Sequence, residues 1–480
     1  GSFYNVTGYS LIVGLSSGSD TLSGQAYGAA AYGQLGAVLQ RAVALCWAAS
    51  VPLCVLWVNA GPVLAAAHDI ADKAARYLRL VAPTIFVSGL AQCVQRYLLA
   101  QRVVAPGTIA TALTACLCPL YNYLLIYRWQ LGLDGAAAAF FVSNFTYALL
   151  LVVYTAWRDA RMAAAKDPRC TWPGLSARTA LSGWGVYLRY GAPAAAMVCA
   201  EWWVFELVIL FAGTLATADV AVAVMGIAFH VTALAYMIPM GVGQAVNTTI
   251  ANALGAGAPE RAAATFRAGL AMVGVTQAVL STSLFVLRAP VVAAFTDAPP
   301  VIALAASTMP AVCATVVADG MNSLLTGVLR GCGRQAWGAW LNLIGYWCIG
   351  FPLSLLLGFT FKMTTVGFWT ALCIASSTQA LIMMAVIFRI DWGKEVERAQ
   401  SLVANDMAGS GAGSECEGSQ HGSPDKAAGG HTGRRDSLQQ QLRRHSGARR
   451  SLQHHEAGTA DVMQSAAADV VGRHDIEATL

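Results

Sequence analysis

Charged residues are scarce in this chain of 480 residues: Asp, Glu, Lys and Arg make up 11% of it, whereas hydrophobic residues make up 56%. A soluble globular protein carries about 25% charged residues, so a water-soluble fold would need an interior far larger than this chain can enclose. Apolar stretches recur instead, and at about 20 residues each is long enough to cross the hydrocarbon of a membrane as a helix. The scarcity of charge therefore excludes a soluble protein and predicts a polytopic membrane protein.

The motifs of several enzyme classes are also missing. No G-x-x-x-x-G-K-[ST] sequence occurs, so the usual ATP-binding loop is absent. No Gly-Asp dipeptide occurs, which argues against an intramembrane aspartyl protease, and no group of Ser, His and Asp suggests a catalytic triad. We therefore expect no enzymatic activity, no cofactor and no nucleic-acid partner, and the energy for any transport would come from an ion gradient.

The twelve cysteines show no metal-binding pattern. Cys116 and Cys118 are the one close pair within the apolar stretches, and neither a CxxC motif nor zinc-ligand spacing occurs. A buried free thiol behaves as a small hydrophobic group. The sequence therefore predicts packing cysteines, no metal and no disulfide framework.

The apolar stretches predict an all-α fold, because β-barrel strands would alternate polar and apolar residues in units of about 10. We expect eleven spans, at residues 3–26, 36–60, 80–101, 107–128, 135–157, 190–213, 219–249, 264–288, 301–328, 336–359 and 363–389.

Basic residues fall mainly on one side of the expected membrane. If spans alternate in direction, one side carries Arg41, Arg96, Arg102, Arg158, Arg161, Lys166, Arg169, Arg178, Arg189, Arg261, Arg267, Arg330, Arg334, Arg389, Lys394 and Arg398. The other side carries only Lys73, Arg76, Arg79, Arg128, Arg288 and Lys362. Since cytoplasmic loops carry an excess of Lys and Arg, the first side is predicted to be cytoplasmic, together with the residues after Arg389.

An internal repeat divides the spans into two groups. The segments DTLSGQAYGAAAYGQLGAVLQR (20–41) and NTTIANALGAGAPERAAATFRA (247–268) align without a gap, so that Gly28 matches Gly255 with an offset of 255 − 28 = 227. Many transporters build alternating access from such repeats. The repeat predicts an N-terminal lobe at 1–157, a cytoplasmic linker at 158–189 and a C-terminal lobe at 190–389.

The same alignment predicts one more helix. The span at 190–213 has no partner at the repeat offset, because that position would precede Gly1. We expect two pseudo-symmetric six-helix bundles in the full protein, with twelve spans.

Residues 390–480 differ in composition, being rich in Gly, Ser, Gln, His and Arg. Such a segment buries too little apolar surface to offset the entropy of ordering its backbone, so we expect a disordered cytoplasmic tail. Ser437, Ser446 and Ser451 follow paired arginines and resemble kinase sites. The alternative for this basic segment is contact with anionic lipid.

Four acidic residues lie within the expected spans: Asp20, Glu201, Glu206 and Asp319. A charged side chain at the centre of a membrane helix costs about 2.5–3.5 kcal/mol, and desolvation favours the protonated form of a carboxyl. These acids are therefore candidates for proton carriers, with internal hydrogen bonding as the alternative. Glu201 and Glu206 are five residues apart, or about 140° around a helix, so at most one faces a central cavity directly. Asp20, near a helix end, is expected to be structural.

Polar and aromatic residues near these acids are candidates for cavity walls. His230 is the one histidine within an expected span, and Trp202 and Tyr236 could face a cationic ligand. Core packing is the alternative for all three. Asn322 is also expected to support the cavity.

The segments SDTLSGQAYGAAAYGQLGAVLQRA, AEWWVFE, ANALGAGAPERA and GVLRGCGRQAWGAWLNLIGYWCIGFPL together resemble the multidrug and toxic compound extrusion (MATE) family, in its eukaryotic branch. The resemblance covers residues 1–392. It implies two six-helix lobes around a V-shaped cavity, and exchange of protons for organic cations, xenobiotics or secondary metabolites. By position, Glu201 is the acid of the E-W-W motif, Glu206 the second acid of that helix and Asp319 the acid before GVLRGCG. His230 stands where animal relatives carry an acid.

We therefore expect a monomeric antiporter in the plasma or vacuolar membrane, with Glu201 binding proton and substrate alternately and Asp319 as its partner. Sodium coupling is an alternative, since carboxylates serve either ion. A flippase for lipid-linked sugars is a second alternative, although its anionic cargo would favour basic residues in the spans. A receptor or scaffold would not explain the repeat.

Overall fold

The computed structural model describes residues 2–59, 61, 71–215 and 217–410. This part of the chain is helical and contains no β-strand, so the all-α prediction is confirmed for it. The first half consists of α1 (Ser2–Tyr4), η1 (Asn5–Tyr9), α2 (Ser10–Ser16), α3 (Gly18–Gly28), α4 (Gly33–Val58), α6 (Ala71–Val81), α7 (Thr84–Ala100), α8 (Ala105–Asn122), η3 (Tyr123–Arg128) and α9 (Gly132–Ala164). Here η denotes a π-helical segment.

After the short helix α10 (Ala177–Leu181) comes the second half of the fold. It consists of α11 (Trp184–Ala212), α12 (Ala218–Gly255), α13 (Pro259–Val286), α14 (Arg288–Ala293), α15 (Pro299–Gly331), α16 (Gln335–Asn342), η4 (Leu343–Gly350), α17 (Phe351–Leu355), η5 (Leu356–Thr360) and α18 (Thr364–Phe388). A last helix, α19 (Trp392–Ser410), follows it. We call α1–α9 the N half and α11–α18 the C half.

Within the described residues, nine helices are long and apolar enough to cross a membrane, and the pair α6–α7, bent by 44°, would make a tenth. The eleventh predicted span, 3–26, is also helical, but it is interrupted at Ser17 and carries several Gly and Ser residues and Asp20. Its lower hydropathy separates it from the other ten.

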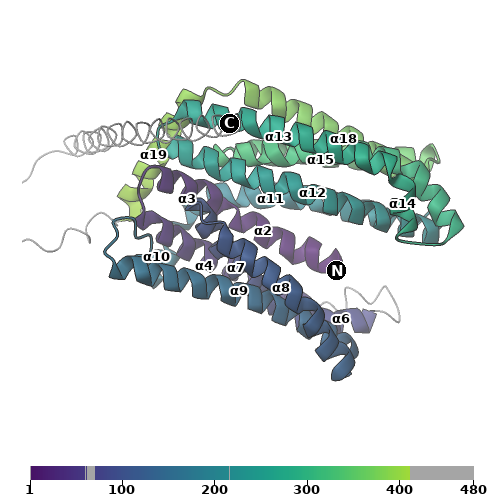
Figure 1. Cartoon of the computed structure of the whole chain (residues 1–480), viewed down its shortest axis with the longest axis horizontal. Coiled ribbons are helices and arrows are strands. Elements are labelled where there is room, and N and C mark those ends of the chain that lie inside the picture. The colour runs from purple at the N-terminus through teal and green to yellow at the C-terminus, as the bar shows by residue number, and fades with distance from the viewer. Residues whose placement is uncertain (1, 60, 62–70, 216, 411–480) are drawn as a thin grey trace, which may run out of the picture. The chain divides into compact units, whose positions relative to one another are not determined.

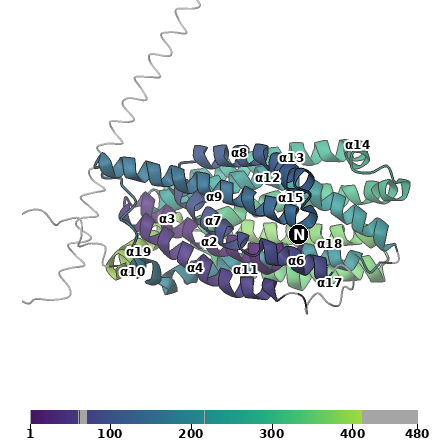
Figure 2. The same ribbon diagram turned by 90° about the horizontal axis from the view of Figure 1, so that it is seen from below.

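Each half has its own apolar core. The N half packs around Ile12, Leu35 and Ile85, and the C half has two clusters, one around Val312 and one around Leu325. Both views place α3, α10 and α19 at one end of the helices and α6 and α14 at the other (Figure 1, Figure 2). We call the first of these the α19 end.

The two halves meet through the segments that the repeat relates. A Cβ atom on Gly28 would collide with the carbonyl oxygen of Asn252, and one on Gly255 would collide with the carbonyl oxygen of Gln25. Gln25 and Asn252 are separated by the same repeat offset as the two glycines, 252 − 25 = 227. Matched residues of α3 and α12 therefore touch each other reciprocally, and glycine permits this close backbone approach.

Small residues also join α2 and α3 to α11. A Cβ atom on Gly18 would lie 2.6 Å from the Cα atom of Gly191, and one on Gly14 would collide with the backbone of Ala195. The N half and the C half are thus in backbone contact along α2 and α3.

The prediction of a disordered tail from residue 390 is wrong for residues 392–410, which form α19. Three apolar residues of α19 recur at helical spacing and are buried against the two halves: Val396, Ala399 and Val403. Asp391 Oδ1 accepts a hydrogen bond from the backbone N–H of Gly393 at 3.0 Å, as an N-cap does. Average composition concealed this short amphipathic pattern. Ser437, Ser446 and Ser451 lie outside the described residues.

Candidate functional site

Two of the predicted acids come together in the C half. Asp319 lies on α15 and is only 5% exposed, while Glu201 lies on α11 and is half-buried. The two carboxyl groups are close enough to interact electrostatically. Two neighbouring carboxyls disfavour simultaneous ionisation, so a proton or a cation between them is stabilised.

Asp319 is held by residues from neighbouring helices. Ser376 Oγ on α18 donates a hydrogen bond to Asp319 Oδ1 at 2.6 Å, and the Tyr346 hydroxyl lies 3.3 Å from Ser376 Oγ. Asn322 Nδ2 donates to the Ser376 carbonyl oxygen at 3.0 Å. These contacts fix the carboxyl of Asp319 with hydroxyl groups and without a basic partner.

Glu201 is held less tightly. Its carboxylate makes no hydrogen bond or ion pair to any described residue, and its electrostatic neighbours are Asp319, Arg330, Tyr236 and Tyr346. Fewer hydrogen bonds must break when Glu201 takes a new partner than when Asp319 does. Glu201 is therefore the acid that is more available to bind a ligand.

Arg330, in the last turn of α15, is a basic neighbour that is distant from Glu201 in sequence. Its Nε atom is buried and has no hydrogen-bond partner in the described part of the chain. Its guanidinium interacts electrostatically with Glu201, Tyr236, Asp20 and Arg96. Arg330 therefore lies between the acid pair of the C half and a second charged group in the N half.

That second group contains Asp20, the acid that the sequence analysis predicted within an N-half span. Arg96 Nη1 on α7 lies 2.6 Å from Asp20 Oδ2, and Asn247 Nδ2 on α12 donates to the same oxygen at 2.9 Å. Asp20 is 7% exposed. Its charge is neutralised within the N half and bonded to the C half, which favours the structural role expected for it.

Glu206 lies apart from these groups. It is half-buried on α11 and makes no hydrogen bond or ion pair within the described residues. The neighbouring Phe205 ring packs near Tyr346 and Trp369, with ring centroids 6.1 and 6.3 Å apart. The structure does not bring the Glu206 carboxyl into the Glu201–Asp319 pair.

The predicted wall residues also separate. Tyr236 and Asn322 lie in the acidic site, as described above. His230 is exposed, and its Nδ1 atom lies 2.7 Å from the Gly226 carbonyl oxygen of its own helix. The Trp202 ring lies near Tyr9 of the N half, 6.1 Å between centroids. His230 is therefore not part of the acidic site, and Trp202 lies where the halves meet.

The sequence analysis missed three groups of this site: Ser376, Tyr346 and Arg330. Arg330 and Tyr346 lie within the segment GVLRGCGRQAWGAWLNLIGYWCIGFPL, which carried the family resemblance, so a signal existed for them. No feature of the sequence around Ser376 distinguishes it. Among the described residues, no group of three or more His, Cys, Asp or Glu side chains could hold a metal ion.

Comparison with known proteins gives a consistent result. The family model MatE matches residues 1–124 and 193–356. Protein DETOXIFICATION 17 from Arabidopsis thaliana is 36% identical over 412 residues, covering 84% of each chain. Protein DETOXIFICATION 16 from the same plant is 34% identical and covers 85% of this chain and 83% of its own length.

Solved structures agree with these relatives. The crystal structure of the eukaryotic MATE transporter AtDTX14 matches with a TM-score of 0.78 and 29% identity, covering 84% of this chain and 89% of that one. An outward-facing multidrug resistance MATE family transporter of the MOP superfamily matches with a TM-score of 0.68 at 17% identity, covering 84% of this chain and 87% of that one. The second match shows the shared fold alone.

Proposed function

The chain belongs to the MATE family of multidrug and detoxification transporters, and from this premise we propose that it is a secondary active antiporter. It exports organic cations, xenobiotics or secondary metabolites in exchange for protons. The resemblance drawn from the sequence motifs is confirmed by the family match.

One observation carries the proton-coupling proposal: Glu201 and Asp319 are neighbouring acids on apolar helices, and neither forms an ion pair with a described basic residue. Such a pair is stabilised by one positive charge, which a proton or a cationic substrate can supply. Competition for the same negative charge makes the two ligands exclude each other, as antiport requires.

The hydrogen bonds of the two acids suggest a different role for each of them. Ser376 and Tyr346 hold Asp319 in place, whereas Glu201 has no competing hydrogen bond. In the proposed cycle Glu201 exchanges the proton for the substrate, and Asp319 sets the local negative charge. Tyr236 and Asn322 form part of the wall around them.

Sodium-coupled exchange is the second candidate, because the carboxyl oxygens and the hydroxyl oxygen of Ser376 are also suitable ligands for a hard cation. A flippase for lipid-linked anions is less favoured, since the site unites two acids with one arginine. Glu206, His230 and Trp202 remain candidates for substrate contacts away from the acid pair.

The placement of charge supports an orientation. Basic residues of the predicted cytoplasmic set lie at the α19 end, among them Arg41 and Arg334, which pair with Asp406 and Glu395 of α19. We therefore propose that this end faces the cytoplasm, in the plasma or vacuolar membrane, and that the chain works as a monomer. A kinase acting on Ser437, Ser446 or Ser451 remains part of this proposal.

The test is pH-gradient-driven flux of a fluorescent organic cation in proteoliposomes. Glu201→Gln keeps the size of the side chain but cannot ionise, so the flux should fall to the level of empty vesicles while the protein still folds. Glu260→Gln is the matched control, because Glu260 is exposed at the start of α13, and it should retain full flux.

Two results would contradict the proposal. Undiminished flux in Glu201→Gln would remove the coupling role of this acid. Flux that follows a sodium gradient and ignores the pH gradient would replace protons by sodium.

A further inference from the structure

Helix α19 extends from one half of the fold to the other, and its first turns dock on the C half. The Glu395 carboxylate accepts a hydrogen bond from Arg334 Nε at 2.9 Å, and Arg398 Nη2 donates to the Gly333 carbonyl oxygen at 3.4 Å. The hydrogen bonds to Glu395 raise the pKa of the Arg334 guanidinium. Val396 and Ala399 are buried in the cluster around Leu325.

The last turns of α19 dock on the N half. Arg41 Nη1 on α4 donates to Asp406 Oδ1 at 3.1 Å, with 4% of the Arg41 side chain and 11% of the Asp406 side chain exposed. Gln34 Nε2 donates to the Val403 carbonyl oxygen at 3.4 Å, and Leu402 packs against the N-half core. The ion pair is therefore shielded from water and salt, unlike a surface pair.

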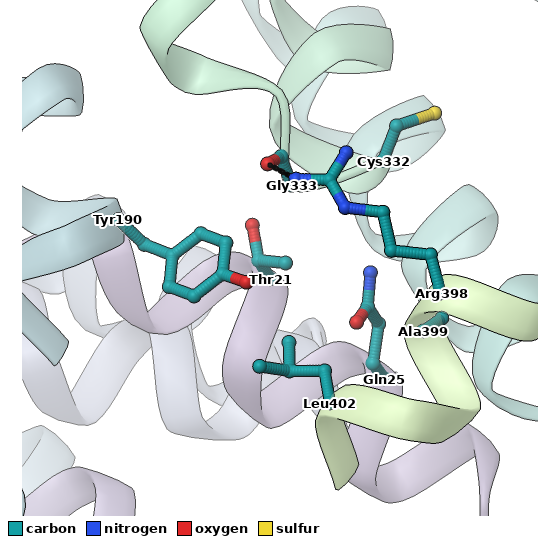
Figure 3. A pocket seen from close by; sticks show the side chains of 8 residues that line it. All are labelled: Thr21, Gln25, Tyr190, Cys332, Gly333, Arg398, Ala399 and Leu402. Atoms are coloured by element: carbon teal, nitrogen blue, oxygen red, sulfur yellow. Dashed lines mark hydrogen bonds between the residues drawn. The ribbon is translucent and has the colours of Figure 1, made fainter. Parts of the chain in front are cut away.

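Between these two anchors α19 covers the junction of the halves. Figure 3 shows the side chains that meet there: Arg398 and Leu402 of α19 face Thr21 and Gln25 of α3. Beneath α19, Thr21 Oγ1 donates to the Arg330 carbonyl oxygen at 2.5 Å. The direct contacts of α3 with the end of α15 thus lie under the helix.

We propose that α19 is a latch that holds the α19 end closed, and that the Arg41–Asp406 ion pair is its releasable contact. The proposal rests on the proposed antiport function, because alternating access requires this end to open. A continuous helix does not lengthen, so separation of the halves must detach α19 from one of them. Among the contacts described above, those with the N half are the Arg41–Asp406 ion pair, the Gln34–Val403 hydrogen bond and Leu402. The C half holds α19 through the Arg334–Glu395 pair, the Arg398–Gly333 bond, Val396 and Ala399.

The distance between the halves at this end tests the latch. Spin labels are attached through genetically encoded azide-bearing residues at positions 164 and 264, which are exposed alanines in α9 and α13. The distance between the two labels is measured by pulsed electron paramagnetic resonance on the full chain in nanodiscs. Asp406→Asn should raise the ratio of long to short distances by at least about fivefold, the lower end of a typical coupling between two states.

Asp391→Asn, at the residue that caps the start of α19, is the matched control. It neutralises an exposed partner of Lys394, at 3.7 Å, and asparagine still caps a helix, so the distance distribution should stay that of the unaltered chain. The charge swap, Arg41→Asp together with Asp406→Arg, should restore the unaltered distribution. If Asp406→Asn does not fold, Arg41→Gln with Asp406→Asn removes both charges and should give the same shift.

The outcomes separate this proposal from the one on which it rests. A distribution that is the same in all variants, in a chain that transports, would overturn the latch and leave antiport intact. A shift in Asp406→Asn that the charge swap reverses, in a chain that moves no substrate, would support the latch and overturn antiport.

Discussion

Asp20 in the N half and Asp319 in the C half are both buried acids on apolar helices, yet their partners differ. Asp20 lies 2.6 Å from the Arg96 guanidinium and accepts a further bond from Asn247. Asp319 accepts a bond of the same length from the Ser376 hydroxyl.

The partner decides what each acid can do. A guanidinium only donates hydrogen bonds and stays charged, so Asp20 has a permanently cationic partner. A hydroxyl both donates and accepts, so Ser376 can satisfy Asp319 with or without its proton. Burial is nearly the same at the two sites, so the chemistry of the partner is what distinguishes them.

The largest expected effect lies at the Arg96–Asp20 ion pair. Arg96→Gln leaves the Asp20 carboxylate buried without a cation, which should destabilise the fold by about 3–5 kcal/mol. Thermal unfolding in detergent measures the loss, and the double variant Asp20→Asn with Arg96→Gln should recover much of it. An unchanged melting temperature in Arg96→Gln would show that the buried carboxyl of Asp20 does not depend on the Arg96 cation.

Asp319→Asn should lower transport strongly and leave the stability of the fold nearly unchanged. The amide cannot ionise but still accepts a bond from Ser376, so the melting temperature should change little. Flux driven by a pH gradient should fall about 100-fold, or roughly 2.7 kcal/mol at 1.36 kcal/mol per tenfold. Loss of stability with retained flux per folded molecule would reverse the comparison between the two acids.

The smallest effect is expected at Glu206. Its carboxyl lies about 140° around α11 from Glu201 and outside the acid pair, so Glu206→Gln should lower the flux less than about threefold, under 0.7 kcal/mol. The initial rate of substrate uptake at saturating pH gradient measures it. A loss equal to that of Glu201→Gln would extend the coupling site along α11.

Much of the fold could be predicted from the sequence because its signals are local. Long apolar stretches gave the helices, and the alignment of Gly28 with Gly255 identified two residues that the structure places on opposite sides of one contact. Glu201 and Asp319 were found because an acid in an apolar stretch is conspicuous.

The partners of these acids were harder to predict. Ser376 is separated from Asp319 by 57 residues, and an isolated serine in an apolar helix carries no signal of its own. Helix α19 was missed because its apolar positions Val396, Ala399 and Val403 are diluted by polar neighbours. Contacts between distant segments decide both features, and composition does not record them.

The reciprocal contact of Gly28 and Gly255 has a mechanical consequence. It lies at the end of α12, a helix of 38 residues. A Cβ atom added at Gly28 or Gly255 would collide with the facing carbonyl oxygen, so the two backbones would have to move apart. Two missing side chains, supplied in duplicate by the repeat, thus let the backbones of α3 and α12 touch, and a larger residue at either position would hold the two halves apart.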